Sequence, residues 1–443
     1  QTGVFYNKVA SINRDLSVLM VTILVRQRME KMLEAMKGDG STGNDIRGWR
    51  ELAMDRADTD GLVILDAMSA SGVRALRYLT EVPGVKKVVA NDHDVAAVAM
   101  TRRSAELCGT GNKLEVRHGD ALDAMYKVRT GSGGREDAFD VIDIDPYGSA
   151  AGFLDAAVQA VKDGGLLCVT STDMPVLSGC QPNVAYARYG SVPVRGGYHH
   201  EMSMRILLHA ISTSAARYRR SMAPVLSVAL DHYVRVFVRI VDSPSQALQA
   251  GTKAMYVFQS EWCPSFFLTP ITQVIPSSRT SLGETPPSPH PNGYGMGGRR
   301  CPQTGGPLRM GGPIWGWPMH DTEWVSLALE MAVDAATRPR LISLLEAVSR
   351  ELPEVPLFYH LKGVFAALGL TRSPRQAQVE TALRRLGYKV SGMHREPRAI
   401  KTDAPDSVMW DVLRCWVREN PQPVPRSVGG IAILSHEPQI HAD

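Results

Sequence analysis

The sequence predicts an α/β fold: an open, mostly parallel sheet with helices on both faces, followed by a smaller α+β domain. Two observations lead to this class. Short apolar runs with the length of buried strands alternate with segments of helical spacing up to Thr170. Four of these runs are followed within three residues by an aspartate, namely Asp66, Asp92, Asp120 and Asp145. Because the carboxyl ends of parallel strands meet at one edge, we expect these carboxylates to surround one ligand site.

The first unit reads as strand, loop, helix and strand. Residues 61–65 form an apolar run, residues 66–72 a loop of small side chains, and residues 73–79 a segment of helical spacing. A second strand is expected over residues 85–90. Asp92 follows Gly72 by 20 positions, the separation typical of a carboxylate that binds ribose hydroxyls. The pattern therefore predicts a nucleotide-binding unit.

The loop at residues 66–72 contains one glycine, Gly72. A pyrophosphate needs several glycines, because backbone N–H groups must approach it closely. A cofactor without phosphates needs only small side chains near its sulfonium and ribose. The loop therefore favours S-adenosylmethionine over NAD, and the alternative is an ordinary tight turn between strand and helix.

Three more strands complete the predicted sheet. Residues 113–117 precede Asp120, which either meets an adenine amino group or caps the next helix. Residues 139–144 precede Asp145, and a helix at residues 151–161 and a strand at residues 165–170 follow.

The turn Asp145-Pro146-Tyr147-Gly148 predicts a site for an exocyclic amine. The carboxylate can accept a hydrogen bond from an N–H group while the ring stacks on the base that carries it. Pro146 fixes φ and removes a competing donor, which holds the turn open. The same four residues are also common as a simple turn, so their position at a strand end is what favours the functional interpretation.

Basic residues are concentrated near the C-terminus. The net charge of the chain is only +4, whereas residues 372–401 hold eight basic and two acidic side chains. A helix over residues 376–386, a stop at Gly387 and a strand from Tyr388 predict a winged-helix-like element that contacts RNA phosphates. The alternative is a solvated helix face. Residues 217–220, with three arginines and a tyrosine, are a second candidate for RNA contact.

The length predicts two or three domains. The Asp-Ser-Pro-Ser-Gln run at residues 242–246, after a strand expected over residues 233–240, reads as a connector, so we expect domains at residues 1–245 and 246–435. Residues 276–307 are rich in Pro, Gly and Ser and predict a long mobile loop, with shorter insertions at residues 36–46 and 127–137. The apolar run at residues 16–25 is only ten residues long and ends at Arg26, so no membrane span is expected.

Several motifs occur in a fixed order along the chain. They are Phe5-Tyr6-Asn7, residues 13–17, residues 66–74, Asn91-Asp92, residues 145–149, residues 170–173, residues 189–191, residues 195–201, residues 311–315, residues 356–359 and residues 400–405. Together they resemble the tRNA guanine-26 N2-dimethyltransferase family of class I S-adenosylmethionine-dependent RNA methyltransferases, and the resemblance covers residues 5–415. It implies a Rossmann-like methyltransferase domain, a C-terminal tRNA-binding domain, and transfer of one or two methyl groups to the N2 amine of guanine-26.

The resemblance also implies roles for single residues. Asp145 would hold the guanine amine and keep electron density on its nitrogen, and Tyr147, where the family usually has Phe, would stack on the extruded base. Without the resemblance, Arg14 suggests an ion pair with Asp15 or a helix cap, and Arg74 suggests a solvent-facing side chain. The residues expected to bind S-adenosylmethionine are Arg14, Asp66, Arg74, Asp92, Asp120 and Ala121.

The cysteines depart from the family pattern. Members of the eukaryotic type have two Cys-x-x-Cys pairs spaced to bind zinc. The matching positions here are Ser260, Cys263, Cys301 and Thr304. A four-thiolate site cannot form, so no metal is expected, and the two thiols are expected to be free, with a disulfide as the alternative. Three further cysteines have apolar neighbours and are expected in the core: Cys108, Cys168 and Cys415.

The sequence His199-His200-Glu201 superficially resembles a metal-binding motif. Adjacent positions on a helix point about 100° apart. We therefore expect a core or RNA-facing role for these residues.

The expected partner is tRNA, and a monomer without membrane contact is expected. The insertions and remnant cysteine pairs resemble eukaryotic members and predict a nuclear location, with mitochondrion, plastid and cytoplasm as alternatives. Two rival functions remain. One is an amino-methyltransferase acting on another nucleic-acid base, and the other is a non-catalytic tRNA-binding paralogue.

Overall fold

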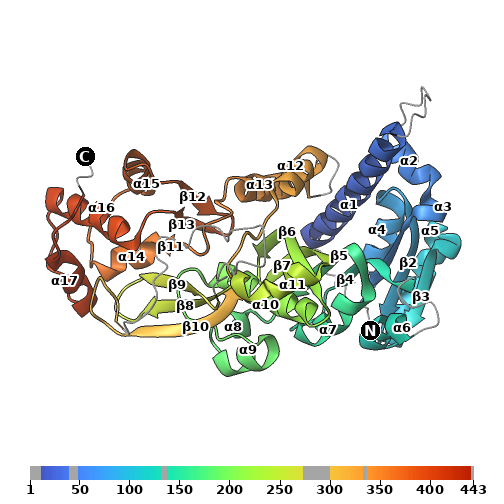
Figure 1. Ribbon diagram of the computed structural model, residues 1–443, viewed down its shortest axis with the longest axis horizontal. Coiled ribbons are helices and arrows are strands. Elements are labelled where there is room, and N and C mark those ends of the chain that lie inside the picture. Colours follow the sequence, from blue (N-terminus) through green and yellow to red (C-terminus); the bar gives the residue numbers. More distant parts are fainter. Residues whose placement is uncertain (1–10, 39–47, 131–136, 273–299, 333–336, 441–443) are drawn as a thin grey trace, which may run out of the picture.

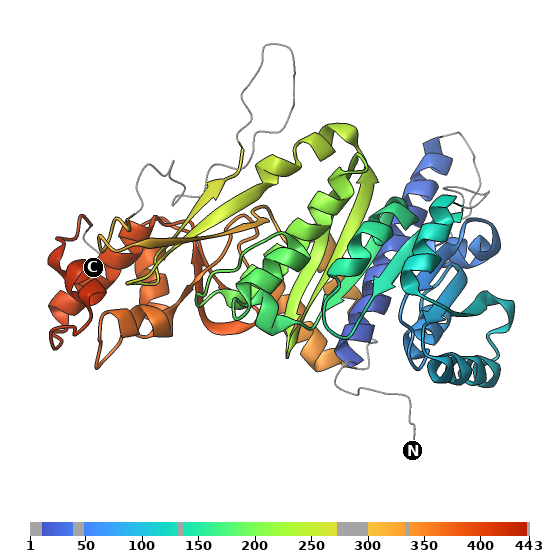
Figure 2. The same ribbon diagram turned by 90° about the horizontal axis from the view of Figure 1, so that it is seen from below.

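The computed structural model describes residues 11–38, 48–130, 137–272, 300–332 and 337–440. Figures 1 and 2 show an elongated molecule, with a large sheet at one end and the C-terminal helices at the other. The segment 5–8 and most of the stretches predicted at 36–46, 127–137 and 276–307 lie outside these residues. Residues 36–38 and 127–130, predicted as parts of insertions, belong instead to the ends of helices.

The large sheet has seven strands in the order β3-β2-β1-β4-β5-β7-β6. Only β7 runs against the others, since it is antiparallel to both β5 and β6. The predicted α/β class and the five predicted parallel strands are therefore confirmed. The strands are β1 (Leu62–Asp66), β2 (Val85–Asp92), β3 (Leu114–His118), β4 (Phe139–Ile144), β5 (Val161–Ser171), β6 (Arg220–Leu230) and β7 (Tyr233–Asp242).

Helices cover both faces of this sheet. One face packs on a core shared with α1 and α4, and the other on a core shared with α6, α7 and α10. Of the 18 residues of α10, 14 are buried, so the helix has no polar stripe from which its period could be recognised. The helices are α1 (Ser11–Gly38), α2 (Trp49–Asp55), α3 (Ala57–Asp60), α4 (Val73–Glu81), α5 (Val95–Cys108), α6 (Ala121–Thr130), α7 (Ala151–Ala160), α8 (Met174–Leu177), α9 (Pro182–Tyr189), α10 (His199–Ala216) and α11 (Pro244–Leu248).

The C-terminal part contains two three-stranded antiparallel sheets. One is formed by β8 (Ala254–Ser260), β9 (Phe266–Pro270) and β10 (Leu308–Trp315), the other by β11 (Tyr359–His360), β12 (Val390–Met393) and β13 (Glu396–Thr402). The predicted helix and its stop are confirmed, because α15 ends at Arg385 and Gly387 adopts a φ of +89°. The helices are α12 (Thr322–Met331), α13 (Arg338–Ser349), α14 (Leu361–Ala367), α15 (Gln376–Arg385), α16 (Asp406–Glu419) and α17 (Val428–Ser435).

The chain returns from the C-terminal part to the large sheet. Trp324 of α12 and Leu341 of α13 belong to the same buried core as Leu16 and Ile23 of α1, and Figure 1 shows both helices beside α1. The division into residues 1–245 and 246–435 stays a prediction, and these two helices cross it.

A buried carboxylate, Glu351, joins the two parts. Its Oε1 accepts the backbone N–H of His394 at 2.6 Å and lies 2.7 Å from the Nδ1 of the same residue. His394 Nε2 accepts the backbone N–H of Ala229 in β6 at 2.9 Å. The ring is therefore neutral, with its proton on Nδ1, and it connects the turn after β12 to the large sheet.

A second buried carboxylate, Glu201 of α10, extends this connection. Lys401 Nζ of β13 lies 2.9 Å from Glu201 and 3.7 Å from Glu351. Glu201 also pairs with Arg205 at 2.8 Å and accepts the N–H of Leu357 at 2.8 Å. Buried ions that are paired and hydrogen-bonded in this way stabilise one arrangement of the two parts, since losing either partner leaves an uncompensated charge. We call Glu201, Glu351, His394 and Lys401 the buried polar clamp.

No helix within the described ranges combines the length and apolarity that a membrane crossing needs.

We expect Glu351→Gln to lower the free energy of unfolding by about 3 kcal/mol, because Lys401 loses part of its compensation inside the protein. Glu346→Gln is the matched control, since Glu346 pairs with Arg350 at 3.6 Å on the surface, and it should change stability by less than about 0.5 kcal/mol. Urea unfolding followed by circular dichroism measures both. Equal midpoints for the two variants would show that the clamp does not stabilise the protein.

Candidate active site at the carboxyl edge of the sheet

The four aspartates predicted to share one ligand site follow four neighbouring strands. Asp66 and Asp92 are the last residues of β1 and β2, and Asp120 and Asp145 come just after β3 and β4. These strands are adjacent and parallel. The structure therefore brings all four to one edge, as the sequence predicted.

The strand end at Asn91 and Asp92 holds the surrounding loops together. Asp92 Oδ2 accepts the backbone N–H of Ala70 at 2.7 Å. Asn91 Nδ2 donates to the carbonyls of Ala67 and Gly119, both at 3.1 Å. The loops after β1 and β3 are thus fixed to β2, and this fixes the shape of the edge where a ligand would lie.

Gly72 is required at the start of α4. Its φ is +73°, a conformation that residues with a Cβ rarely adopt. A Cβ at this position would also lie 2.6 Å from Thr101 Cγ2. The single glycine of the loop therefore serves close packing between α4 and α5.

The end of β1 and the loop after it contain polar atoms that the protein leaves unsatisfied. Within the described chain, Asp66 Oδ2 and Ser69 Oγ are buried without a hydrogen-bond partner. Burial raises the pKa of Asp66 to about 7, although Arg74 opposes this shift. Buried polar atoms normally find partners, so these two fit a ligand that carries hydroxyl or cationic groups.

Asp120 caps α6, which confirms one of its two predicted roles, the helix cap. Its Oδ1 accepts the backbone N–H of Leu122 at 2.7 Å. Asp120 is exposed and Ala121 is buried beside it. The contact with an adenine amino group stays a prediction.

Arg74 is buried beneath Asp145. Its Nη2 forms an ion pair with Asp145 and donates to Asn13 Oδ1 at 3.0 Å, while its Nη1 lies 2.7 Å from Asp143 Oδ1. Only 8% of Arg74 is exposed, so the solvent-facing interpretation is wrong. The guanidinium instead orients the carboxylate that was predicted to bind the amine.

Asp143 is the centre of a buried ionic network. It accepts from Tyr78 Oη at 2.6 Å and from Arg235 Nη2 at 2.7 Å, in addition to Arg74. Arg235 Nη2 also donates to Ser17 Oγ at 2.7 Å. Burial alone would raise the pKa of Asp143, but Arg235 and Arg74 outweigh it and lower the pKa.

The turn after β4 is fixed from below by the segment after β5. Gly148 N–H donates to Thr172 Oγ1 at 2.7 Å, and the N–H of Thr172 donates to the carbonyl of Gly148 at 2.9 Å. Ser149 Oγ donates to Tyr189 Oη at 2.7 Å, and Tyr189 donates to Asp173 at 2.8 Å. Tyr147 itself is 80% exposed. The turn therefore presents a rigid, solvent-facing ring, which suits stacking on a base.

Arg14 lies in the first turn of α1 and is 9% exposed. The neighbouring Asp15 pairs with Arg77 at 2.6 Å and accepts the N–H of Thr337 at 2.9 Å. The role of Arg14 toward a cofactor carboxylate stays a prediction.

Sequence reasoning missed Asp143, Tyr78 and Arg235. The signal was present: Asp143 interrupts the apolar run of β4, and Arg235 interrupts β7, where all the residues from Tyr233 to Val238 are buried. A charge inside a buried strand requires a partner of opposite charge. An ion pair between Asp143 and Arg235 could therefore have been predicted from the sequence.

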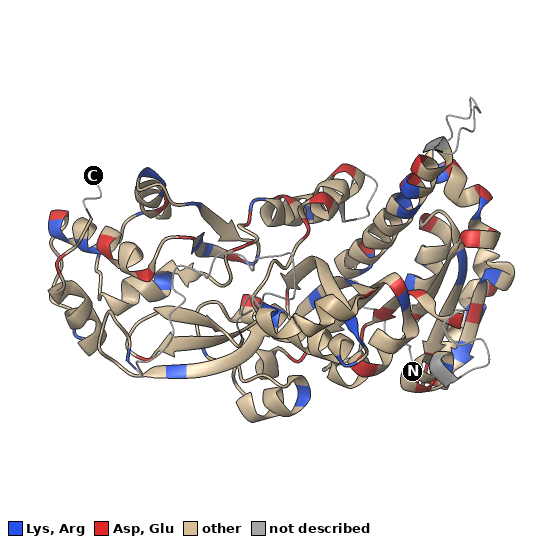
Figure 3. Ribbon diagram, in the orientation of Figure 1, with Lys and Arg blue, Asp and Glu red and all other residues tan. Residues whose placement is uncertain are grey.

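Six of the eight basic residues at 372–401 are exposed: Arg372, Arg375, Arg384, Arg385, Lys389 and Arg398. Figure 3 shows basic residues on α15. Lys401 belongs to the buried polar clamp, so its expected contact with phosphates is wrong. The cluster at 217–220 lies at the opposite end of the sheet from Asp145, and Arg220 is buried against Asp242 at 2.6 Å.

The four positions that correspond to the zinc ligands of the family come together. Cys263 Sγ lies 3.7 Å from Cys301 Sγ and 3.3 Å from Ser260 Oγ. The hydrogen bond with Cys263 lowers the pKa of Cys301 to about 5, with help from Thr304. Both thiols are free, as expected. Cys168 is buried as predicted, but Cys108 is exposed at the end of α5, so its assignment to the core is wrong.

We expect Tyr78→Phe to reduce the free energy of unfolding by about 2 kcal/mol, because Asp143 loses a buried hydrogen bond to a charged oxygen. Tyr186→Phe is the control, since Tyr186 is 63% exposed and its hydroxyl should contribute less than about 0.5 kcal/mol. Urea denaturation compares the two. A Tyr78→Phe protein as stable as the control would contradict the importance of this contact.

Comparison with known proteins identifies the family. A family model described as N2,N2-dimethylguanosine tRNA methyltransferase matches residues 1–414. The tRNA (guanine(26)-N(2))-dimethyltransferase 1 of Arabidopsis thaliana is 43% identical over 86% of this chain, which spans 63% of that protein's length. The Homo sapiens tRNA (guanine(26)-N(2))-dimethyltransferase is 34% identical over 99% of this chain and 70% of its own length.

A solved structure agrees with these relatives. Trm1 from Pyrococcus horikoshii in complex with S-adenosyl-L-methionine matches with a TM-score of 0.70 and 26% identity, over 92% of this chain and 94% of that chain. The chain belongs to the N2,N2-dimethylguanosine tRNA methyltransferase family.

Proposed function

We propose that the protein transfers one or two methyl groups from S-adenosylmethionine to the exocyclic N2 amine of guanine-26 in tRNA. The observation that carries the proposal is that Asp145 and an exposed Tyr147 share one turn, at the same edge of the sheet as the unsatisfied polar atoms of Asp66 and Ser69. A carboxylate and a ring on one rigid turn suit an aromatic base with an amino group.

S-adenosylmethionine, when bound, supplies a methyl group activated by a sulfonium charge. The unsatisfied Asp66 Oδ2 and Ser69 Oγ fit such a polar, cationic ligand. The residues that would hold it are Arg14, Asp66, Arg74, Asp92, Asp120 and Ala121, with Asp92 toward the ribose.

Asp145 acts on the amine. The lone pair of a guanine amine is delocalised into the ring, so the nitrogen is a weak nucleophile. A carboxylate that accepts a hydrogen bond from one N–H keeps electron density on the nitrogen and orients it. Arg74, bonded to Asp145 and anchored on Asp143, limits the rotation of that carboxylate.

The amine becomes acidic once it is alkylated, so Asp145 or water can take its proton. A secondary amine still carries one hydrogen, and the same geometry can therefore bind it for a second transfer. Tyr147 would stack on the base, which has to leave its stacked position to reach the turn.

The exposed basic residues of α15 and the following hairpin would contact tRNA phosphates. We propose a monomer that works in the nucleus. Among the relatives, a Saccharomyces cerevisiae protein that is 28% identical over 93% of this chain is named as mitochondrial.

We expect Asp145→Asn to lower the rate of methyl transfer by about 10²-fold or more while tRNA still binds, since the amide cannot accept the proton. Labelled S-adenosylmethionine and an unmodified tRNA transcript measure the rate. Asp58→Asn is the control, because Asp58 is exposed on α3. A transcript with adenine at position 26 should receive no label.

Each unexpected result has a distinct meaning. Label in the altered transcript would move the target to another base. A wild-type protein that binds tRNA without incorporating label would instead be a non-catalytic paralogue.

We expect the affinity for S-adenosylmethionine to rise with pH up to about 7 and then level off. The pKa of Asp66 is about 7 in the free protein, so below this pH the carboxyl is largely protonated. A cationic ligand favours the ionised form, so binding must release a proton there, and affinity falls by up to about tenfold per pH unit.

Isothermal titration calorimetry in buffers of different ionisation enthalpy measures this proton release. Asp66→Asn should abolish the pH dependence, and S-adenosylhomocysteine, which lacks the sulfonium charge, should show less of it. An unchanged profile in Asp66→Asn would assign the proton to another group.

A further inference from the structure

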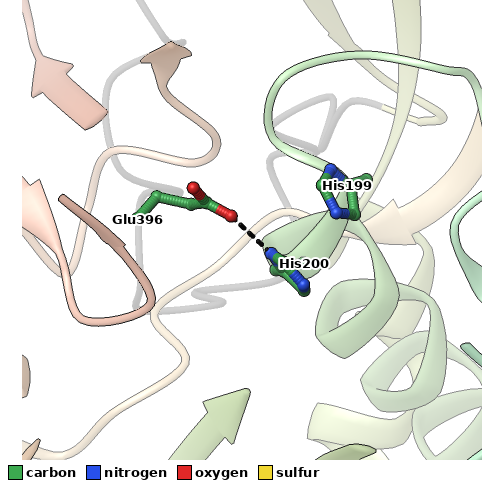
Figure 4. Close-up of side chains that lie close together, drawn as sticks. All are labelled: His199, His200 and Glu396. Carbon is green, nitrogen blue, oxygen red and sulfur yellow. Dashed lines mark hydrogen bonds and ion pairs between the residues drawn. The ribbon is translucent and has the colours of Figure 1, made fainter. Parts of the chain in front are cut away.

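Three potential metal ligands converge where α10 meets the hairpin of β12 and β13. His199 and His200 open α10, and Glu396 opens β13. One ligand atom of each residue lies within 4.8 Å of those of the other two. The two imidazole rings have their centroids 4.0 Å apart, and Figure 4 shows Glu396 reaching toward His200 from the hairpin.

The contacts around Glu396 hold this cluster together. His200 Nδ1 lies 2.6 Å from Glu396 Oε1, and His360 Nε2 lies 3.7 Å from Glu396 Oε2. A Cβ on Gly197 would lie 2.5 Å from His360 Cβ, so glycine permits the close approach of that histidine. The side chains of His200 and Glu396 are 17% and 16% exposed, which leaves the cluster accessible to an ion.

We propose that His199, His200 and Glu396 form a binding site for a divalent transition-metal ion, with Zn²⁺ as the best fit. Two imidazoles and one carboxylate are a ligand set that zinc accepts, with water in the remaining position. The ion would replace the hydrogen bond between His200 and Glu396 and draw the ligand atoms to about 2.0–2.2 Å. His360 would orient the second carboxylate oxygen, as groups behind metal ligands commonly do.

A second cluster of the same composition does not qualify. His320, Glu351 and His394 also lie close together. However, His320 Nδ1 accepts the N–H of Ser227 at 3.2 Å, and His394 Nε2 accepts that of Ala229. The remaining nitrogen of each ring faces Glu351 and carries the proton, so neither ring has a free lone pair for a metal.

Arg395 is a cation that directly precedes Glu396 in the chain. Its Nη2 donates to the carbonyl of Asp231 at 3.1 Å, which directs the guanidinium toward the turn between β6 and β7. An ion at the proposed site would link α10 to β13, the same two elements that Glu201 and Lys401 connect. Its expected effect is therefore on stability as well as on metal content.

The test measures metal content and cobalt spectra of the full chain. The protein is stripped with a chelator, incubated with zinc and dialysed, and we expect about one equivalent of zinc to remain. Co²⁺ should give visible bands of a site with nitrogen and oxygen ligands. A hundredfold excess of zinc over its dissociation constant should raise the melting temperature by about 3 °C.

The variants identify the ligands. His200→Ala and Glu396→Gln should each lose both the bound zinc and the zinc-dependent rise in melting temperature. Glu396→Gln keeps the shape of the side chain, so it still tests the site if His200→Ala folds poorly. His436→Ala, which removes an exposed histidine of the C-terminal segment, should retain both. The double variant Cys263→Ser and Cys301→Ser should also retain both.

Two results would overturn the proposal. Zinc that stays in His200→Ala and Glu396→Gln but is lost from the double cysteine variant, with sulfur-to-cobalt charge-transfer bands, would place the metal at the thiols. Failure of the wild-type protein to keep zinc would mean that the cluster is held by its hydrogen bond alone.

Discussion

The ion pairs of Asp143 with Arg74 and Arg235 are the constraint on which the candidate site depends. Asp143 lies in the central strand β4 and is fully buried, so its charge is tolerable only while both guanidiniums are present. Through them it reaches Ser17 of α1 and Asp145 at the strand end. Packing of α1 and α4 on the sheet, and the orientation of the carboxylate that would meet the amine, therefore depend on the same buried charge.

The turn that carries Asp145 combines rigidity with exposure. Its backbone is hydrogen-bonded to Thr172, and the next residue, Ser149, is hydrogen-bonded to Tyr189. Two segments that are distant from the turn in sequence therefore hold it in place. Tyr147 supplies the exposure, since its ring faces solvent. A rigid support lowers the entropy cost of aligning a base with the cofactor edge, and an exposed ring lets the base arrive from outside.

The sequence predicted the parts of the fold that have strong periodic or turn signals. The parallel strands, the loop at Gly72 and the helix stop at Gly387 were all found, because each follows from local chemistry. Helix α10 was not, because it is buried nearly all around. The solvent-facing alternative for Arg74 was wrong, since the distant Asp143 and Asp145, which pair with this first-turn arginine, cannot be recognised from the sequence around it. Local patterns cannot give contacts between residues so far apart in the chain.

Adjacent residues at the start of α10 point into two different environments. The expectation that the adjacent histidines diverge is wrong, because the ring centroids of His199 and His200 lie 4.0 Å apart. Divergence is found instead between His200 and Glu201: the carboxylate points inward to Lys401, while the imidazole points to Glu396. Glu201 and His200 of α10 both contact β13, through Lys401 and Glu396. Two contacts to a single strand therefore connect the part that would bind the cofactor with the part that would bind tRNA. A change in either contact should therefore alter how a bound tRNA is presented to Asp145.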